Sequence, residues 1–202
     1  MPHTLKIVLC LFLAFSAAAA QNDGTAAFAP PRYRVVAAKF VQIRHLEELD
    51  MDVESRGSMV SELDGRLRWQ VDAPVKSVTL IERDKLTHYD GETGRTAVIE
   101  TEKFPWLELL REALQDWFSG DRERLARRFQ VTSPRPETLL LVPRDAALKT
   151  LCREVEIVFS PRGGIVERVR ITENSGDTME MRFSEIELDP KLPPNTWQMP
   201  ER

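Results

Sequence analysis

The chain has 202 residues, 42% of them hydrophobic and 30% charged, with a formal net charge of −4 at pH 7. This length suffices for one domain with a sizeable core, and the acidic balance argues against a general nucleic-acid binder. There are two cysteines in the whole chain.

Residues 1–20 have the pattern of a secretory signal peptide. MPHTLK is short and basic, IVLCLFLAF is an apolar run too short to span a bilayer, and SAAAAQ offers small residues for cleavage. We predict cleavage near Ala20 and a mature chain outside the cytoplasm; an uncleaved anchor is the alternative. Losing Lys6 leaves 27 basic against 32 acidic residues, a net charge of −5. Cys152 alone then remains, so no internal disulfide can form.

Residues 21–34 read as a flexible lead-in, and six strands are predicted after them, at 35–46, 52–63, 65–71, 75–82, 84–94 and 96–101. Residues 84–94 hold a short strand and an Asp-Gly turn signal. In the third strand Leu67, Trp69 and Val71 alternate with polar residues, which gives one apolar face, and Pro74 ends it. Gly57 marks a bulge or a close approach of another backbone.

The hydrophobic period then becomes helical. Apolar residues at 106, 107, 109, 110, 113, 114, 117 and 118 predict a helix that begins at Pro105 and ends at Gly120. Asp121 can cap a second helix over 122–129, with Leu125, Ala126 and Phe129 on one side.

Strands return at 137–143, 152–161, 164–173 and 178–188, with turn signals at 161–164 and 174–176, which predicts an antiparallel meander. The apolar phase of the last strand switches after Phe183, so we expect a bulge near Ser184 or Glu185. The tail is predicted to be extended. Nine or ten strands and one helical insertion indicate a mainly β fold, an antiparallel barrel or half-barrel with helices over its concave side.

No catalytic constellation is visible in the sequence. His45 and His88 have no metal-ligand spacing, and the acidic cluster at 47–54 lacks the ligand order of a calcium loop. Arg153 is the only cation that the sequence places next to Cys152, so we do not expect a reactive thiol. The basic run 122–128 is read as a solvated helix face, with an anionic membrane surface as the alternative. We therefore predict no enzyme, no metal and no cofactor.

The apolar sheet face and the helix allow two interpretations, an ordinary closed core or a lipid site between them. Pattern alone favours the core, because amphipathic helices usually face cores.

Several segments resemble the LolA family of periplasmic lipoprotein carriers. They are Phe-Val-Gln at 40–42, Gly-Ser-Met at 57–59, Leu-Arg-Trp at 67–69 with a Pro five residues after the Trp, and TLIERDKLTHYD at 79–90. The helical insertion and closing meander follow in the family's order, so the resemblance covers about residues 35–190. FVQIRHLEEL and the following SRG resemble a branch associated with lipid or polyene export.

The resemblance implies one domain over 35–202, an incomplete barrel whose apolar cavity is covered by lid helices at about 105–129. It implies a monomeric periplasmic carrier of acylated lipoprotein, with an inner-membrane transporter and an outer-membrane acceptor as partners. A carrier of an exported lipid or lipid-linked product and a lipid-sensing module are the alternatives. The family's lid-latching Arg falls on Leu63 here; Arg66 or Arg68 could replace it, but both lie in the phase opposite Trp69. The cavity and lid candidates are Leu67, Trp69, Val71, Leu80, Trp106, Leu110, Leu114, Trp117, Phe159, Met179, Met181 and Phe183.

Overall fold

A computed structural model describes residues 33–62, 65–100, 126–144, 146–160 and 165–200. The described chain is mainly β. Its elements are β1 (Val35–Leu46), the short 3-10 helix η2 (Glu47–Leu49), β2 (Met51–Glu62), β3 (Leu67–Ala73), β4 (Ser77–Ile81), β5 (Lys85–Asp90), β6 (Arg95–Glu100), β7 (Phe129–Arg135), β8 (Thr138–Pro143), α4 (Ala146–Leu151), β9 (Glu154–Phe159), β10 (Val166–Thr172) and β11 (Thr178–Leu188).

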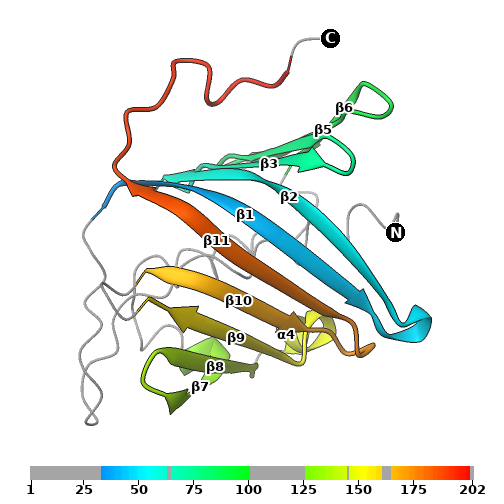
Figure 1. Cartoon of the computed structure of the whole chain (residues 1–202), viewed down its shortest axis with the longest axis vertical. Coiled ribbons are helices and arrows are strands. Elements are labelled where there is room, and N and C mark those ends of the chain that lie inside the picture. Colours follow the sequence, from blue (N-terminus) through cyan, green and yellow to red (C-terminus); the bar gives the residue numbers. More distant parts are fainter. Residues whose placement is uncertain (1–32, 63–64, 101–125, 145, 161–164, 201–202) are drawn as a thin grey trace. The chain divides into compact units, whose positions relative to one another are not determined.

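All eleven strands belong to one sheet, in the order β6-β5-β4-β3-β2-β1-β11-β10-β9-β8-β7 (Figure 1). Sequence neighbours are therefore sheet neighbours, except where β11 pairs with β1. The predicted antiparallel, mainly β fold is confirmed. The predicted half-barrel and helical lid stay predictions, because the helix predicted at 105–118 lies outside the described residues.

The chain divides into two compact units, and each is described by itself. The first unit contains residues 43–53 and the described parts of 126–182, and the second contains 33–42, 54–100 and 183–200. In the second unit, β3 to β6 form successive hairpins (Figure 1). The predicted Asp-Gly turn joins β5 to β6: the Asp90 carboxylate accepts hydrogen bonds from the Glu92 and Thr93 amides, and Gly94 takes a φ of 65°.

In the first unit, β7 to β10 form a meander with α4 inserted before β9 (Figure 1). Alternate residues of β9 and β10 are fully buried, since Val155, Ile157, Val169 and Ile171 are all 0% exposed. The predicted turn at 174–176 is confirmed, with Gly176 at φ 98°. The buried residues of β9 and β10 therefore form one face of the sheet, which lies against the core, and the residues between them form the other face, which carries charged side chains.

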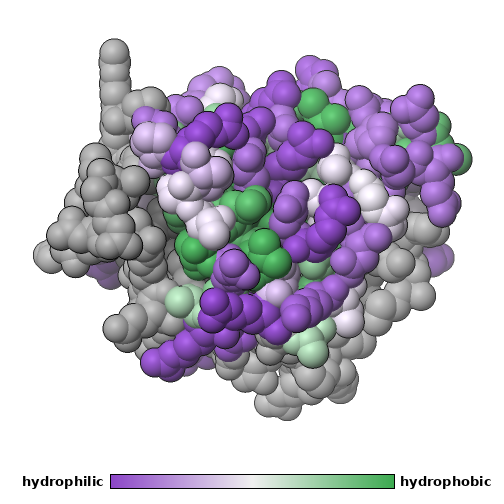
Figure 2. All heavy atoms as spheres, turned by 90° about the horizontal axis from the view of Figure 1, so that it is seen from below, coloured by the Kyte–Doolittle hydropathy of each residue, from purple (hydrophilic) through white to green (hydrophobic). Residues whose placement is uncertain are grey.

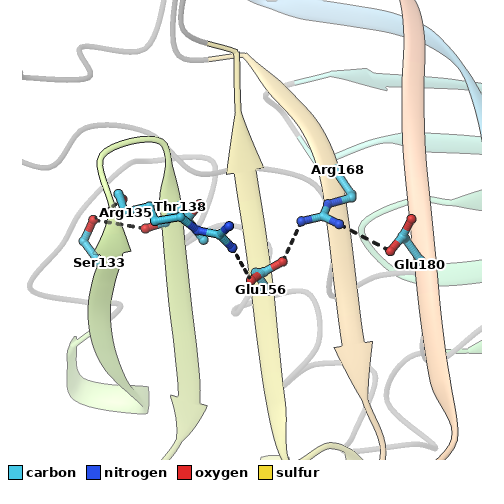
Figure 3. Close-up of polar contacts among 6 residues, drawn as sticks. All are labelled: Ser133, Arg135, Thr138, Glu156, Arg168 and Glu180. Carbon is cyan, nitrogen blue, oxygen red and sulfur yellow. Dashed lines mark hydrogen bonds and ion pairs between the residues drawn. The ribbon is translucent and has the colours of Figure 1, made fainter.

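That charged face carries a ladder of ion pairs across four strands of the first unit (Figure 3). Arg135 lies 3.4 Å from Glu156, Glu156 lies 2.8 Å from Arg168, and Arg168 lies 3.6 Å from Glu180. Arg168 pairs diagonally with carboxylates of the two neighbouring strands, and Arg135 reaches Glu156 across β8, so opposite charges meet along this polar face.

Three expectations are corrected. Phe129 begins β7 and is not helical, so the second predicted helix ends before it and one strand was missed. The short helix α4 was also missed, because its six residues are too few to show a helical period. The tail is not simply extended: it turns at 194–197, where the Thr196 amide donates to the Pro193 carbonyl.

Two local predictions about irregular backbone are met. Glu185 takes a left-handed φ of 49° inside β11, at the predicted change of phase. The register between β2 and β3 shifts at Arg56–Gly57, where a Cβ on Gly57 would lie 1.8 Å from the Gln70 carbonyl oxygen. Gly57 is therefore both a bulge and a close approach.

Candidate functional site

The register of β2 to β5 defines one apolar face in the second unit. Trp69 is opposite Met59 on one side and Thr79 on the other, and Leu67 is opposite Ile81. We call this surface the Trp69 face; it comprises Gly57, Met59, Ser61, Leu67, Trp69, Val71, Thr79, Ile81, Leu86 and His88. Of the candidates, Leu67 and Trp69 are buried on it and Val71 is half-buried.

Phe40 from β1 completes this face. Its ring stacks on Trp69 with the centroids 3.9 Å apart and the planes 25° from parallel. Phe40 and Met59 were missing from the predicted site, although the Phe-Val-Gln motif contains the first and the Gly-Ser-Met motif the second. Both are almost fully buried, at 2% and 1% exposure.

Polar atoms are also buried at this face. The Trp69 indole Nε1 and the Gln42 Oε1 are buried and have no hydrogen-bond partner among the described residues. Thr79 and His88 instead satisfy each other, with 2.9 Å between Oγ1 and Nδ1. Burial lowers the pKa of His88 below its ordinary value, against an opposing effect of the Asp90 charge, so this imidazole is neutral at pH 7.

A second apolar face lies in the first unit. The register places Met181 opposite Val169, and Val169 opposite Ile157, while Met179 is opposite Ile171. Met179 and Met181 are 0% exposed, and Phe159 continues the buried alternation of its strand. We call this surface the Met181 face. The structure therefore groups these three candidates with other buried apolar residues of alternating strands. Phe183 continues the buried alternation of β11 but belongs to the second unit.

Leu80 is not part of the Trp69 face. Leu80 is opposite Arg68 in the register, so it lies on the other side of the sheet from Trp69, where it is buried. Strand 77–81 is buried on both sides at its centre, and the sequence pattern therefore does not reveal which side Leu80 faces. The lid candidates Trp106, Leu110, Leu114 and Trp117 lie outside the described residues.

Arg66 and Arg68 contact the C-terminal tail. Arg68 Nη1 donates to the Thr196 and Gln198 carbonyls at 3.1 and 2.7 Å, and the Arg66 guanidinium lies 4.7 Å from the Trp197 ring centroid. The tail, the end of β11 and the polar side of β1 to β3 line an open pocket of about 370 Å³. Arg68 lies on the side of the sheet opposite Trp69, and its guanidinium binds the tail. The contact joins residues 128 positions apart, and no sequence pattern predicts it.

The described residues offer little for catalysis. Within the part of the chain that the structure describes, no group of three His, Cys, Asp or Glu side chains could hold a metal ion. Burial, with a smaller effect of the Glu173 charge, raises the pKa of the Cys152 thiol to about 12, so this cysteine is not a nucleophile at neutral pH. No helix in the described ranges is long and apolar enough to cross a membrane.

Hydrophobic atoms also reach the molecular surface. Figure 2 shows a group of hydrophobic residues, in green, with hydrophilic residues in purple on several sides of it.

Comparison with known proteins places the chain in a family. Residues 32–200 match the family described as "Outer membrane lipoprotein carrier protein LolA". The chain is 24% identical over 166 residues to an outer-membrane lipoprotein carrier protein of Legionella pneumophila (strain Paris), covering 82% of this chain and 78% of that protein.

Two solved structures have similar folds. One is a DUF1329 family protein from Desulfovibrio piger, with a TM-score of 0.50, 10% identity, and coverage of 96% of this chain and 95% of that one. The other is an uncharacterized conserved protein from Thermus thermophilus, with a TM-score of 0.50, 11% identity, and coverage of 84% of this chain and 87% of that one. At these identities the likeness concerns the fold alone.

Proposed function

We propose that this chain, which belongs to the LolA family of outer membrane lipoprotein carrier proteins, is a periplasmic carrier that shields acyl chains in an apolar cavity and transfers them toward the outer membrane. The observation that carries the proposal is the Trp69 face, an aromatic and apolar sheet surface built from segments that resemble the family's motifs. We do not assign it an enzymatic reaction.

The physical demands on a carrier agree with these residues. Each methylene removed from water contributes about 0.8 kcal/mol, so one long acyl chain is worth on the order of 10 kcal/mol. Rapid release then requires an acceptor of similar apolarity and a lining that adapts to the cargo. Methionine side chains are flexible and polarisable, and Met59, Met179 and Met181 supply them on the two apolar faces.

The proposal assigns the lid to the helix that the sequence predicts at 105–118. Its apolar side chains Trp106, Leu110, Leu114 and Trp117 would close over the acyl chains. A lid must open at a lower free energy than the sheet beneath it. Amide exchange in 105–118 is therefore expected to be faster than in β9 and β10, and to slow when an acylated ligand is bound.

A binding assay with matched variants tests the carrier function. Val71→Glu places a charge at a half-buried position of the Trp69 face, and Gln70→Glu places the same charge on the other side of the same strand. Because an unpaired charge is costly in an apolar site, Val71→Glu is expected to weaken binding of a fluorescent fatty acid and of a triacylated lipopeptide about tenfold or more. Gln70→Glu should bind as the parent does.

The class of cargo follows from the same assay. Lipopeptide binding stronger than fatty-acid or phospholipid binding supports lipoprotein as cargo, and the reverse supports an exported lipid or a lipid-sensing role. If neither ligand binds and no lipid copurifies with the protein, the Trp69 face is an ordinary closed core and the carrier function is wrong.

Location in the periplasm is part of the proposal. Export with cleavage after Ala20 would leave Gln21 as the first residue, and N-terminal sequencing of the protein from a periplasmic extract tests this. An intact Met1 in that extract would contradict cleavage.

A further inference from the structure

We propose that the Trp69 indole N–H and the Gln42 side-chain carbonyl form a polar anchor, within the apolar lining, for the amide or ester linkage of an acylated cargo. This inference rests on the proposed carrier function and adds to it the chemical group that the site selects. Both residues belong to the second unit.

Trp69 and Gln42 each bury a polar atom that has no partner in the described chain. Trp69 is 3% exposed and Gln42 is 6% exposed, and Trp69 Nε1 and Gln42 Oε1 have no hydrogen-bond partner within the described chain. Leaving such groups unpaired is unfavourable, and buried polar atoms in folded proteins are nearly always paired. One donor and one acceptor without partners in an apolar lining therefore point to a ligand that supplies both.

The residues opposite Trp69 do not satisfy its indole N–H. On β4 the residue opposite is Thr79, whose hydroxyl lies 2.9 Å from His88 Nδ1 and makes no hydrogen bond with the indole. On β2 the residue opposite Trp69 is Met59, whose thioether is a weak hydrogen-bond acceptor. The stack with Phe40 also holds the indole plane in place, so the donor is oriented before any ligand arrives.

Gln42 lies on the same side of β1 as Phe40. The buried positions of β1 alternate as Val36, Ala38, Phe40 and Gln42, so Gln42 follows Phe40 on the same side of the strand. Phe40 touches Trp69, so Gln42 lies two residues along β1 from the ring that stacks on the indole. The apolar row of β1 ends at this amide side chain, and Arg44 follows it.

The chemistry of the two atoms defines the preferred ligand. The indole N–H donates to a carbonyl oxygen, which an ester and an amide both have. The Gln42 oxygen accepts from an N–H, which a secondary amide has and an ester lacks. An alkane has neither. The anchor therefore favours amide-linked acyl groups over esters, and esters over plain hydrocarbon.

Three probes of equal chain length separate these contributions: an N-alkyl fatty amide, a fatty-acid alkyl ester and an alkane, each displacing a fluorescent fatty acid. The affinity ratios between probes are compared between the parent and each variant, so that the different hydration of the probes cancels. Trp69→Phe keeps the aromatic stack and removes the donor, and Gln42→Leu removes the acceptor. Trp197→Phe removes an indole N–H on the other side of the sheet and is the matched control.

Each hydrogen bond is expected to contribute a factor of about three to ten in affinity. Trp69→Phe should therefore reduce the advantage of the ester over the alkane by that factor, and Gln42→Leu should do the same for the amide over the ester. Trp197→Phe should leave both ratios unchanged. A nitrogen-15 indole NMR signal, assigned to Trp69 because it remains in Trp106→Phe, Trp117→Phe and Trp197→Phe, should shift when the ester binds but much less when the alkane binds.

The outcomes distinguish this inference from the carrier function. If the alkane and fatty acid bind but neither variant alters the ratios, the anchor is wrong and the carrier function stands. If no probe binds, both proposals fail. Should Trp69→Phe not fold, the indole shift in the parent protein still decides, and an indole signal that does not move with the ester would overturn the anchor.

Discussion

Phe40 and Trp69 form a stacked pair, with ring centroids 3.9 Å apart, although β2 lies between their strands in the sheet. Gly57 explains how the rings can meet. A Cβ on this residue would lie 3.0 Å from the Phe40 Cζ atom and 1.8 Å from the Gln70 carbonyl oxygen. The absence of a side chain lets the Phe40 ring pass over β2 and brings the backbones of β2 and β3 close together.

We predict that Gly57→Ala destabilises the protein strongly. The added methyl group would collide with backbone, which cannot move aside as a flexible side chain can, and it would disturb the Phe40–Trp69 stack. We expect a loss of about 2 kcal/mol or more in the free energy of unfolding, measured by urea denaturation. Ser58→Ala, at the next position on the opposite face of β2, should change it by less than about 1 kcal/mol. Equal stability of Gly57→Ala and the parent would show that the approach is not tight.

The strands were predictable because their signals are local. Alternation in 65–71 and the turn residues at 90–91 and 174–176 specify hairpins without reference to the rest of the chain. The missed strand β7 lacks such signals: its burial pattern has Phe129 buried and the next residues mostly exposed, and it contains Pro134. Only its pairing with β8 makes it a strand.

The candidate site was predictable in part for the same reason. Trp69 and Met181 lie on alternating strands, so their faces follow from the sequence. Leu80 lies on a strand that is buried on both sides, so the sequence pattern does not show which side its side chain faces. Only its pairing with Arg68 in the register places it on the side opposite Trp69. The roles of Arg66 and Arg68 depend on the tail, which is distant in sequence, and no local pattern encodes such a contact.

We predict that Arg68 holds the tail against the sheet. Arg68→Met keeps an apolar stem and removes both donors to the Thr196 and Gln198 carbonyls. The tail should then be cut by protease under native conditions several-fold faster than in the parent, because a released segment is accessible. Arg170→Met, an exposed arginine of β10, is the control. Unchanged cleavage in Arg68→Met would show that other contacts hold the tail.

We predict that the Cys152 thiol does not react in the folded protein. It is 1% exposed, and its pKa is raised to about 12, mainly by burial, so little thiolate exists at pH 8. Alkylation by iodoacetamide at pH 8, followed by mass spectrometry, should modify the protein only after denaturation. Rapid alkylation of native protein would mean that the site around Leu148 and Cys152 opens readily.

We predict that His45 stabilises the folded protein more at low pH than at high pH. Its Nδ1 lies 2.8 Å from the Asp52 carboxylate and its Nε2 lies 3.5 Å from Glu47. The hydrogen bond to Asp52 raises the pKa of His45 above 6.5, with smaller effects of the neighbouring acidic charges. A raised pKa gives stability that is fully present below pH 6.5 and is lost as the pH rises through the folded-state pKa. The stability difference between the parent and His45→Asn should therefore shrink from about pH 5.5 to about pH 8.5, and a constant difference would contradict this.

We predict the opposite pH dependence for His88. Burial lowers the pKa of this imidazole, so the folded protein resists protonation that the unfolded chain accepts near pH 6.5. The contribution of neutral His88 to the free energy of unfolding is therefore complete above pH 6.5 and is lost as the pH falls toward the folded-state pKa. His88→Gln can retain a hydrogen bond to Thr79 without a titrating group, and should lose less stability than the parent between about pH 7.5 and about pH 5.5. Because the unpaired Trp69 lies beside Thr79, protonation of His88 should also weaken binding of the ester probe in this range. If the parent and His88→Gln lose stability in parallel as the pH falls, the Thr79–His88 pair is not the group that titrates.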